Sequence, residues 1–280
     1  MLHDGVEVTY DYLVVATGTK SLWVVPGAKT FWGPDSEEAV AEITDLLDSV
    51  KASRVILTMP DLTAWQLPVY ELALYLAAIP RDDATSPVTI TIASPEKVPL
   101  ESFGEQASRR VASMLAESQV EFLSETVPVA FEDGSLTTGS GDSLAADAVI
   151  NLPSLTGHRL GGLAYNENGF IEVNPFSEVE GLDRVYAIGD VTDFPVKFGS
   201  LATGQADVAA ASIAAHAWGR PEPGPFQPRL SGILLTADGP VLLDSDASQE
   251  DRPSAEHESW DPSRKIYGRF LSPFLASIRD

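Results

Sequence analysis

The sequence predicts an α/β protein, in which strands and helices alternate along the chain and the sheets are parallel. Two strand ends carry this prediction: an apolar run from Val185 to Ile188 stops at Gly189-Asp190, and an earlier one, Tyr12 to Val15, stops at Ala16-Thr17-Gly18. Between them, apolar runs typical of buried strands alternate with amphipathic stretches typical of helices. Such alternation favours a parallel sheet.

The turn after Gly189-Asp190 leads into an Ala-rich helix that is predicted to begin at Gly199-Ser200 and to end near Trp218. A carboxylate at a strand end accepts hydrogen bonds from ligand hydroxyls, and the free N–H groups of a helix start attract negative oxygen. On this stretch alone, an ordinary strand–turn–helix unit, with Asp190 as a turn or capping residue, explains the pattern equally well.

Composition limits the classes of function. With 41 acidic against 18 basic residues the formal net charge is −23, which argues against nucleic acid and against electrostatic docking on anionic lipid. The absence of cysteine excludes disulfides, thiolate nucleophiles and iron–sulfur clusters, and the four histidines have no ligand-like spacing, so no metal site is predicted. No apolar run reaches the roughly 20 residues that cross a bilayer. The expected location is cytoplasmic, with a peripheral membrane location as the alternative.

The middle of the chain, beyond a hinge at Pro26-Gly27, predicts a second α/β unit. Its predicted strands and helices are, in order, helix Asp35–Val50, strand Arg54–Met59, helix Pro68–Ile79, strand Thr89–Ala93 and helix Ser102–Ser118. Short β-runs with Asp-Gly and Gly-Asp turns predict a meander over residues 120–152.

A Pro- and Gly-rich linker, Gly219 to Pro228, separates a C-terminal region. Gly232 to Leu243 predicts a hairpin that turns at Asp238-Gly239, and residues 265–278 predict an amphipathic helical stretch. Its apolar stripe consists of Phe270, Leu271, Phe274, Leu275 and Ile278. Because Pro273 interrupts the stretch and basic residues are few, core packing or a homodimer contact is favoured over membrane docking.

Together the two strand ends resemble the paired flavin motifs of the pyridine-nucleotide–disulfide oxidoreductase superfamily. In that family an Ala-Thr-Gly strand closes the first part of the FAD domain, a second nucleotide-type domain follows, and a later Gly-Asp places its Asp on the ribityl chain of FAD. The resemblance is strongest to the branch of the sulfide:quinone reductases and flavocytochrome c flavoproteins. It implies two Rossmann-like domains, the first incomplete: residues 1–26 end the first part of the FAD domain, 27–152 form the inserted NADH-domain-like unit, 153–219 form the second part of the FAD domain, and 220–280 form the C-terminal region.

The same resemblance implies which residues contact FAD, although it names no catalytic residue. The implied contacts are Thr17, Gly18, Gly189, Asp190, Lys197, Gly199 and Leu201. Lys197 would lie near the pyrimidine edge of the flavin, where a cation and a helix N-terminus stabilise negative charge on the reduced ring. The electron acceptor that the resemblance implies is a small molecule or a quinone.

The sequence departs from the family pattern in three ways. It has no Gly-x-Gly-x-x-Gly turn at a helix start, where the family binds the FAD pyrophosphate, so this chain alone is expected to bind FAD weakly or not at all. The connection Pro60–Pro68 contains no glycine, so NADH binding is not expected. The redox cysteine that sulfide:quinone reductases carry near the position of Gln66 or Leu67 is missing.

Three functions remain open from the sequence. The first is an FAD-dependent oxidoreductase that transfers electrons through a flavin without redox cysteines. The second is a truncated, cofactor-free remnant, and the third is a non-catalytic interaction module that uses the inserted unit and the tail. The resemblance covers nearly the whole chain and favours the first function for the parent protein, whereas for this chain in isolation the second function is a serious rival.

Overall fold

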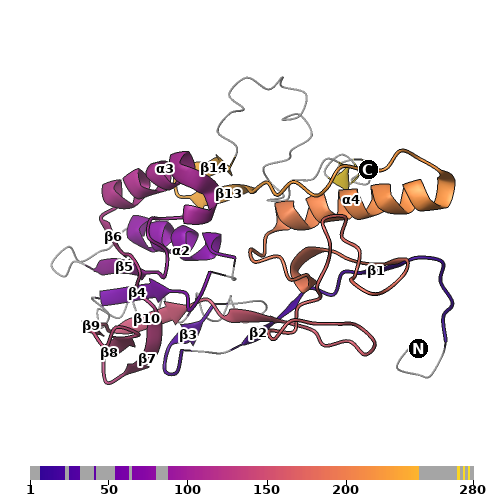
Figure 1. The fold of residues 1–280 in the computed structure, drawn as a ribbon. Coiled ribbons are helices and arrows are strands. Elements are labelled where there is room, and N and C mark those ends of the chain that lie inside the picture. Colours follow the sequence, from indigo (N-terminus) through magenta and orange to yellow (C-terminus); the bar gives the residue numbers. More distant parts are fainter. Residues whose placement is uncertain are drawn as a thin grey trace.

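The computed structural model describes residues 7–22, 25–31, 41, 54–62, 65–79, 88–245, 270, 271, 274 and 277. They form the predicted α/β architecture, with a five-stranded parallel sheet at one end and the Gly-Asp strand and its helix at the other (Figure 1). The helix predicted over Asp35–Val50 lies outside the described residues, apart from Ala41, and so does most of the C-terminal stretch.

The parallel sheet has the strand order β3-β10-β4-β5-β6. Its strands are β3 (Lys29–Thr30), β4 (Arg54–Thr58), β5 (Thr89–Ala93), β6 (Val120–Leu123) and β10 (Ala148–Asn151). One face is covered by α2 (Leu67–Ala78) and by α3 (Gly104–Glu117), which follows the short 3-10 helix η2 (Glu101–Phe103) (Figure 1). The predicted alternation of strands and helices is therefore confirmed for this part of the chain.

The other face of the sheet carries a three-stranded antiparallel sheet: β7 (Pro128–Glu132), β8 (Ser135–Thr138) and β9 (Ser143–Ala145). Strand side chains alternate between the two faces, so that Val55 and Leu57 of β4 face the helices while Ile56 packs towards β8. The meander predicted for residues 120–152 is thus limited to β7–β9. Strands β6 and β10 belong instead to the parallel sheet, and all four residues of β10 are buried, as in a central parallel strand.

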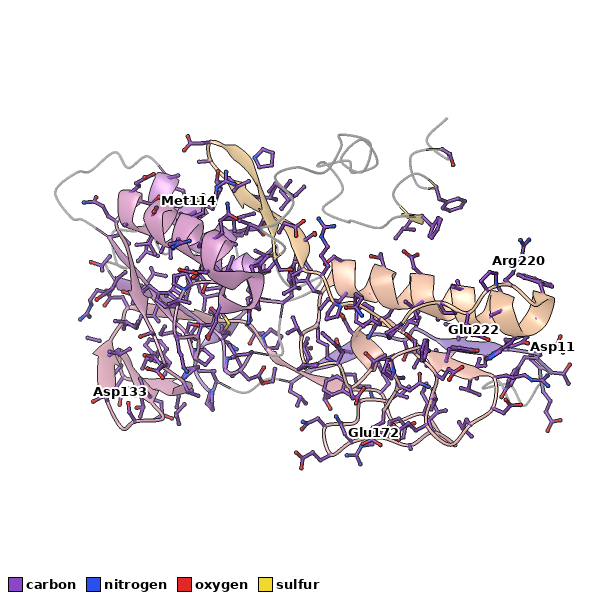
Figure 2. All side chains as sticks on the ribbon, turned by 45° about the horizontal axis from the view of Figure 1, so that its top comes forward. Asp11, Met114, Asp133, Glu172, Arg220 and Glu222 are labelled. Carbon is purple, nitrogen blue, oxygen red and sulfur yellow. The ribbon has the colours of Figure 1, made fainter. Side chains whose placement is uncertain are left out.

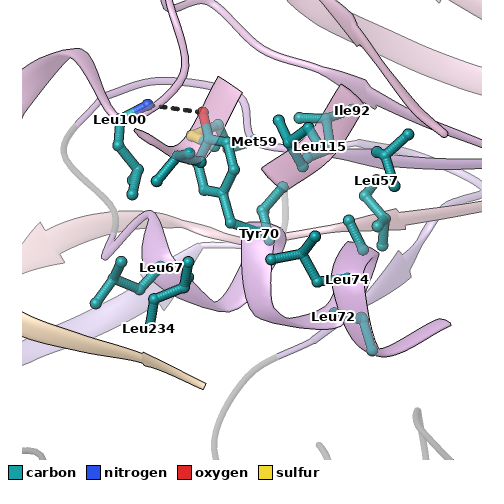
Figure 3. Close-up of a cluster of buried hydrophobic side chains, with 14 of the residues drawn as sticks. Leu57, Met59, Leu67, Tyr70, Leu72, Leu74, Ile92, Leu100, Leu115 and Leu234 are labelled. Carbon is teal, nitrogen blue, oxygen red and sulfur yellow. Dashed lines mark hydrogen bonds between the residues drawn. The ribbon is translucent and has the colours of Figure 1, made fainter. Parts of the chain in front are cut away.

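Helix α2 is covered on two sides. Eight of its twelve residues are buried, because the sheet lies under it and a C-terminal hairpin lies against it. The hairpin consists of β13 (Ser231–Thr236) and β14 (Gly239–Asp244), close to the range predicted. Figure 3 shows Tyr70 of α2 beside Met59 and Leu100, with Leu67 and, from the hairpin, Leu234 together on the other side of the helix. A helix that is apolar on nearly all sides is typical of such a position.

The Gly-Asp turn lies in the first unit, outside the five-stranded sheet of the second unit. β1 (Leu13–Val15) pairs in parallel with β12 (Val185–Ala187), which is followed by the 3-10 turn η3 (Gly189–Val191) and by α4 (Gly199–Trp218). The helix has the predicted bounds, and it ends at Gly219, whose φ of 62° is left-handed. The antiparallel ribbon of β2 (Thr19–Leu22) and β11 (Ser154–Gly157) joins the two units, and the chain after α4 returns to the hairpin (Figure 1).

Acidic residues are spread over the described surface. Figure 2 labels Asp133 and Glu222, which are both exposed and lie at opposite ends of the molecule. Among the described residues, no helix has the length and apolar character that a bilayer crossing requires. The division of the chain at residues 26, 152 and 219 stays a prediction.

Candidate functional site

The two motifs singled out in the sequence lie side by side at one edge of the β1–β12 pair. Because the strands are parallel, their carboxyl ends share an edge, and Val15 lies opposite Ala187. The N–H of Ile188 donates to the carbonyl oxygen of Val15 at 3.0 Å, which ties the start of the Gly-Asp turn to the start of Ala16-Thr17-Gly18. Two stretches far apart in the sequence thus form one site.

The backbone at this edge is open. Gly18 has a φ of +67°, and a Cβ built on it would meet no atom within 4 Å. A Cβ on Gly199, at the start of α4, would also meet nothing within 4 Å. Gly189 differs, because its φ is +73° and its Cβ would lie 3.3 Å from the Cβ of Ala202. The Gly-Asp turn therefore packs on the first turn of α4, while Gly18 and Gly199 leave room for a ligand to approach the backbone.

Asp190 is half-buried, and its carboxylate takes part in none of the hydrogen bonds of the described residues. Burial raises the pKa of its carboxyl above the ordinary value, and the positive charge of Lys197 acts in the opposite direction. A half-buried carboxylate at the open edge of a parallel strand pair is a suitable acceptor for the hydroxyl groups of a ligand. Of the predicted residues, it has the clearest free hydrogen-bonding capacity.

The start of α4 faces the same edge. Phe198 caps the helix without a side-chain hydrogen bond, and the first N–H groups of a helix have no intrahelical acceptor. Leu201 is 3% exposed and belongs to the large core, so only its backbone N–H is suited to a ligand. Thr17 is exposed and lies directly before Gly18. The hydrogen-bonding groups at this edge, one acceptor carboxylate and the donor N–H groups of a helix N-terminus, fit the ribityl hydroxyls and the electron-rich edge of a flavin.

Lys197 lies beneath the turn and is 3% exposed. Its Nζ donates to the carbonyl oxygens of Thr192 at 2.5 Å and Phe194 at 2.6 Å, and it lies 3.8 Å from the centroid of the Phe170 ring. Burial lowers the pKa of Lys197 to about 8, although the charges of Asp190 and Asp193 raise it. Two of its three donors thus hold the loop between η3 and α4, and its place near the flavin pyrimidine stays a prediction.

Gln205 is a site residue that the sequence reasoning missed. It is 4% exposed; its Oε1 accepts from the N–H of Gly189 at 2.7 Å, and its Nε2 donates to Oγ1 of Thr192 at 3.2 Å. The Thr192 hydroxyl in turn donates to the carbonyl oxygen of Gly189 at 2.8 Å. These bonds fix the Gly-Asp turn against α4. The sequence signal that could have identified it is the buried side of α4, which consists of Leu201, Gln205, Ala209 and Ser212. A glutamine buried among such small or apolar residues needs hydrogen-bond partners.

The low pKa of Lys197 predicts a specific pH dependence. In the folded chain the ammonium loses its proton near pH 8, whereas an ordinary lysine keeps it to about 10.5. Between these values the unfolded state binds more protons, so the free energy of unfolding should rise with pH, by up to about 1.4 kcal/mol per pH unit. Below about pH 8 the lysine is charged in both states, and the cost of burying its charge lowers the free energy of unfolding in full.

Urea denaturation across this window measures the effect. The free energy of unfolding of the wild type should rise relative to that of Lys197→Met, which has no group to titrate there. Lys20→Met, at an exposed position of β2, is the matched control and should follow the wild type. Parallel pH profiles for the wild type and Lys197→Met would contradict the lowered pKa of Lys197.

In the second unit, the corresponding strand–helix edge is filled by protein side chains. The Tyr70 hydroxyl of α2 donates to Oε2 of Glu96, and the N–H of Leu100 donates to the Tyr70 hydroxyl at 3.1 Å. Ser94 and the N–H of Glu101 also bond the Glu96 carboxylate, at 2.9 and 3.1 Å. Burial raises the pKa of both Tyr70 and Glu96. The segment after β5 is therefore fastened to the first turns of α2.

Comparison with known proteins places the fold and the sequence in one family. Residues 70–215 match the pyridine nucleotide-disulphide oxidoreductase family. Apoptosis-inducing factor homolog A of Dictyostelium discoideum is 28% identical over 69% of this chain, and homolog B of the same organism is 27% identical over 84%. The chain spans 52% and 66% of the lengths of these relatives.

Solved structures show the same fold. The sulfide:quinone oxidoreductase of the hyperthermophilic bacterium Aquifex aeolicus superimposes with a TM-score of 0.66 at 20% identity, over 82% of this chain and 60% of that one. An NAD-dependent persulfide reductase of A. fulgidus gives a TM-score of 0.56 at 18% identity, over 82% and 43% of the two chains. The family match covers more than half of the chain and includes the Gly-Asp turn and most of α4, and so the chain belongs to the pyridine nucleotide-disulphide oxidoreductase family.

Proposed function

We propose that this chain acts as part of an FAD-dependent oxidoreductase and holds the flavin half of FAD. The observation that carries the proposal is the position of Asp190: a carboxylate with no hydrogen bond among the described residues, at an open strand edge shared with Gly18 and facing the start of α4. FAD, when bound, supplies the redox chemistry. The chain has no cysteine, so electrons would pass through the flavin without a protein disulfide.

Each site residue has a proposed role. Asp190 accepts hydrogen bonds from the ribityl hydroxyls, and Thr17 and Gly18 line the same edge through their backbone. Gly199 allows close approach to the start of α4, where the N–H of Leu201 and the helix dipole favour the electron-rich edge of the ring. Gly189 lets the turn pack on α4, and Lys197 contributes positive charge from beneath it. The hydrogen bonds between Gln205, Gly189 and Thr192 hold the turn in position against α4.

The proposal includes a limit on affinity. In the sequence no Gly-x-Gly-x-x-Gly turn stands at a helix start, so the pyrophosphate of FAD lacks the backbone cradle that such turns provide. Each charge-assisted hydrogen bond contributes roughly 1.5–3 kcal/mol, so the loss of several weakens binding by orders of magnitude. The chain alone therefore binds FAD weakly, and a βαβ segment with the glycine turn restores affinity.

The second unit is proposed not to bind NADH. A dinucleotide site needs a glycine turn before a helix whose N-terminal N–H groups are accessible. Here Pro68 removes one N–H, the first four residues of α2 are buried, and Gln66 at the helix cap accepts a hydrogen bond from Ser102 at 2.9 Å. Isothermal titration calorimetry should detect no binding of NADH at micromolar concentrations; micromolar affinity would contradict the proposal.

The oxidoreductase proposal is tested with the chain joined to the N-terminal βαβ segment of a family member. This fusion should retain stoichiometric FAD, whose visible absorbance is bleached by a chemical reductant and returns when a soluble quinone is added without oxygen. A fusion that folds but holds no flavin would refute the proposal and favour the cofactor-free alternative. We further propose that the electron acceptor is a quinone or another small molecule. We also propose that the protein forms a homodimer and that its location is cytoplasmic or peripheral to the membrane.

A further inference from the structure

A second site is suggested by a cavity of about 570 Å³ that lies away from the Gly-Asp turn. Its walls come from three parts of the chain that only the fold brings together: the outer side of α2, the end of strand β13, and Phe31 directly after β3. Small-molecule sites typically have volumes of roughly 300–1,000 Å³ and mostly apolar walls. The cavity falls within this range.

Aromatic and aliphatic side chains dominate the walls. Phe31, Trp65 and Tyr75 contribute rings. Tyr75 on α2 is 51% exposed, and Leu235 on the opposite wall is 45% exposed. Large apolar groups that are exposed together around one cavity mark a binding site more often than single exposed ones do.

Two of the polar groups in the walls are already engaged within the protein. Oε1 of Glu71 accepts from the N–H of Leu235 at 2.8 Å, which ties α2 to the hairpin. The Thr236 hydroxyl donates to the carbonyl oxygen of Gly239 at 2.7 Å. Ligand recognition would therefore rest on shape and apolar contact. The Glu71 carboxylate and the formal net charge of −23 both disfavour an anion.

The packing beside the cavity is tight, which favours walls that are ordered before a ligand binds. A Cβ on Gly232 of β13 would lie 2.9 Å from the Phe198 ring and 3.1 Å from Leu67, which means that the hairpin backbone contacts these side chains directly. The Trp65 ring meets Phe198 edge to face, with the ring centroids 6.1 Å apart. Preformed walls reduce the entropic cost of ordering a ligand.

We propose that this cavity is a binding site for an uncharged small molecule with flat, aromatic rings. Such a molecule stacks against Trp65, Phe31 and Tyr75 and needs no hydrogen-bond partner. The inference rests on the cavity alone and holds whether or not the chain binds FAD, so the two proposals can fail separately.

Two dyes with the same ring framework test the proposal. N-phenylnaphthylamine is uncharged, and anilinonaphthalenesulfonate adds a sulfonate; both fluoresce in apolar surroundings. We expect saturable binding of one uncharged dye per chain, with a Kd on the order of 10 μM, and at least about tenfold weaker binding of the sulfonate. No saturable binding, or equal affinities for the two dyes, would overturn the proposal.

Variants locate the site. Ala237→Trp places an indole at the exposed rim of the cavity and should weaken binding of the uncharged dye at least about tenfold. Ala112→Trp, at an exposed position of α3 outside the cavity, is the matched control and should bind like the wild type. Tyr75→Ser removes one ring from the wall and should weaken binding several-fold, with thermal midpoints reporting that the variants are folded. Wild-type affinity in both Ala237→Trp and Tyr75→Ser would show that the dye binds elsewhere.

Discussion

Asp190→Ala should weaken FAD binding roughly 10- to 150-fold in the chain joined to an N-terminal βαβ segment. This range corresponds to the loss of a charged hydrogen-bond acceptor worth about 1.5–3 kcal/mol. Asp190→Asn keeps one acceptor oxygen and should fall between the wild type and the alanine variant. Fluorescence quenching of FAD on titration with each protein gives the dissociation constants.

Asp183→Ala is the matched control for Asp190. Its side chain is 90% exposed and lies just before β12, so its removal changes the charge equally without touching the open edge. It should bind FAD like the wild type. If Asp183→Ala and Asp190→Ala weakened FAD binding equally, a general charge effect would replace the specific role proposed for Asp190. Thermal midpoints show whether either variant loses its fold.

Tyr70→Phe should lower the free energy of unfolding by roughly 2–5 kcal/mol. The Tyr70 hydroxyl donates to the buried carboxylate of Glu96 and accepts from the N–H of Leu100, so its removal leaves two buried polar groups each short of a partner. Each such group costs about 1–3 kcal/mol, and charged groups cost more. Urea denaturation monitored by circular dichroism measures the change.

Tyr75→Phe is the control on the same helix. The Tyr75 side chain is 51% exposed, so loss of its hydroxyl should change stability by less than about 0.5 kcal/mol. Equal stabilities of the two phenylalanine variants would mean that the Tyr70–Glu96 network does not hold the segment after β5 to α2. The interpretation that protein side chains close the strand–helix edge of the second unit would then lose its main physical support.

Local patterns were sufficient to predict several elements. The bounds of α4 follow from a run of small residues between Phe198 and Gly219, and β5 follows from the alternation of threonine and isoleucine in Thr-Ile-Thr-Ile-Ala before Ser94. Local patterns do not predict which sheet a strand joins, because this depends on partner strands that are far apart in the sequence. β6 and β10 lie next to the turns of the meander along the chain, yet each pairs with a distant parallel strand.

The candidate site was predicted only in part. The Gly-Asp and Ala-Thr-Gly motifs identified the strand edge, because their order and spacing resemble those of a known family. Gln205 was missed because its partners, Gly189 and Thr192, lie 16 and 13 residues earlier, and no local pattern shows that a helix will turn that side towards them. The closure of the second unit by Tyr70 and Glu96 was missed for the same reason: 26 residues separate the two partners.

The visible absorbance of the purified 280-residue chain, after incubation with excess FAD and removal of free ligand, measures directly how much FAD the chain holds by itself. The site proposed here holds the flavin half of FAD but offers no cradle for the pyrophosphate. We therefore predict less than about a tenth of an equivalent of FAD in the chain alone and close to one equivalent in the fusion with a βαβ segment. A yellow preparation of the chain alone, with one FAD per chain, would contradict the account.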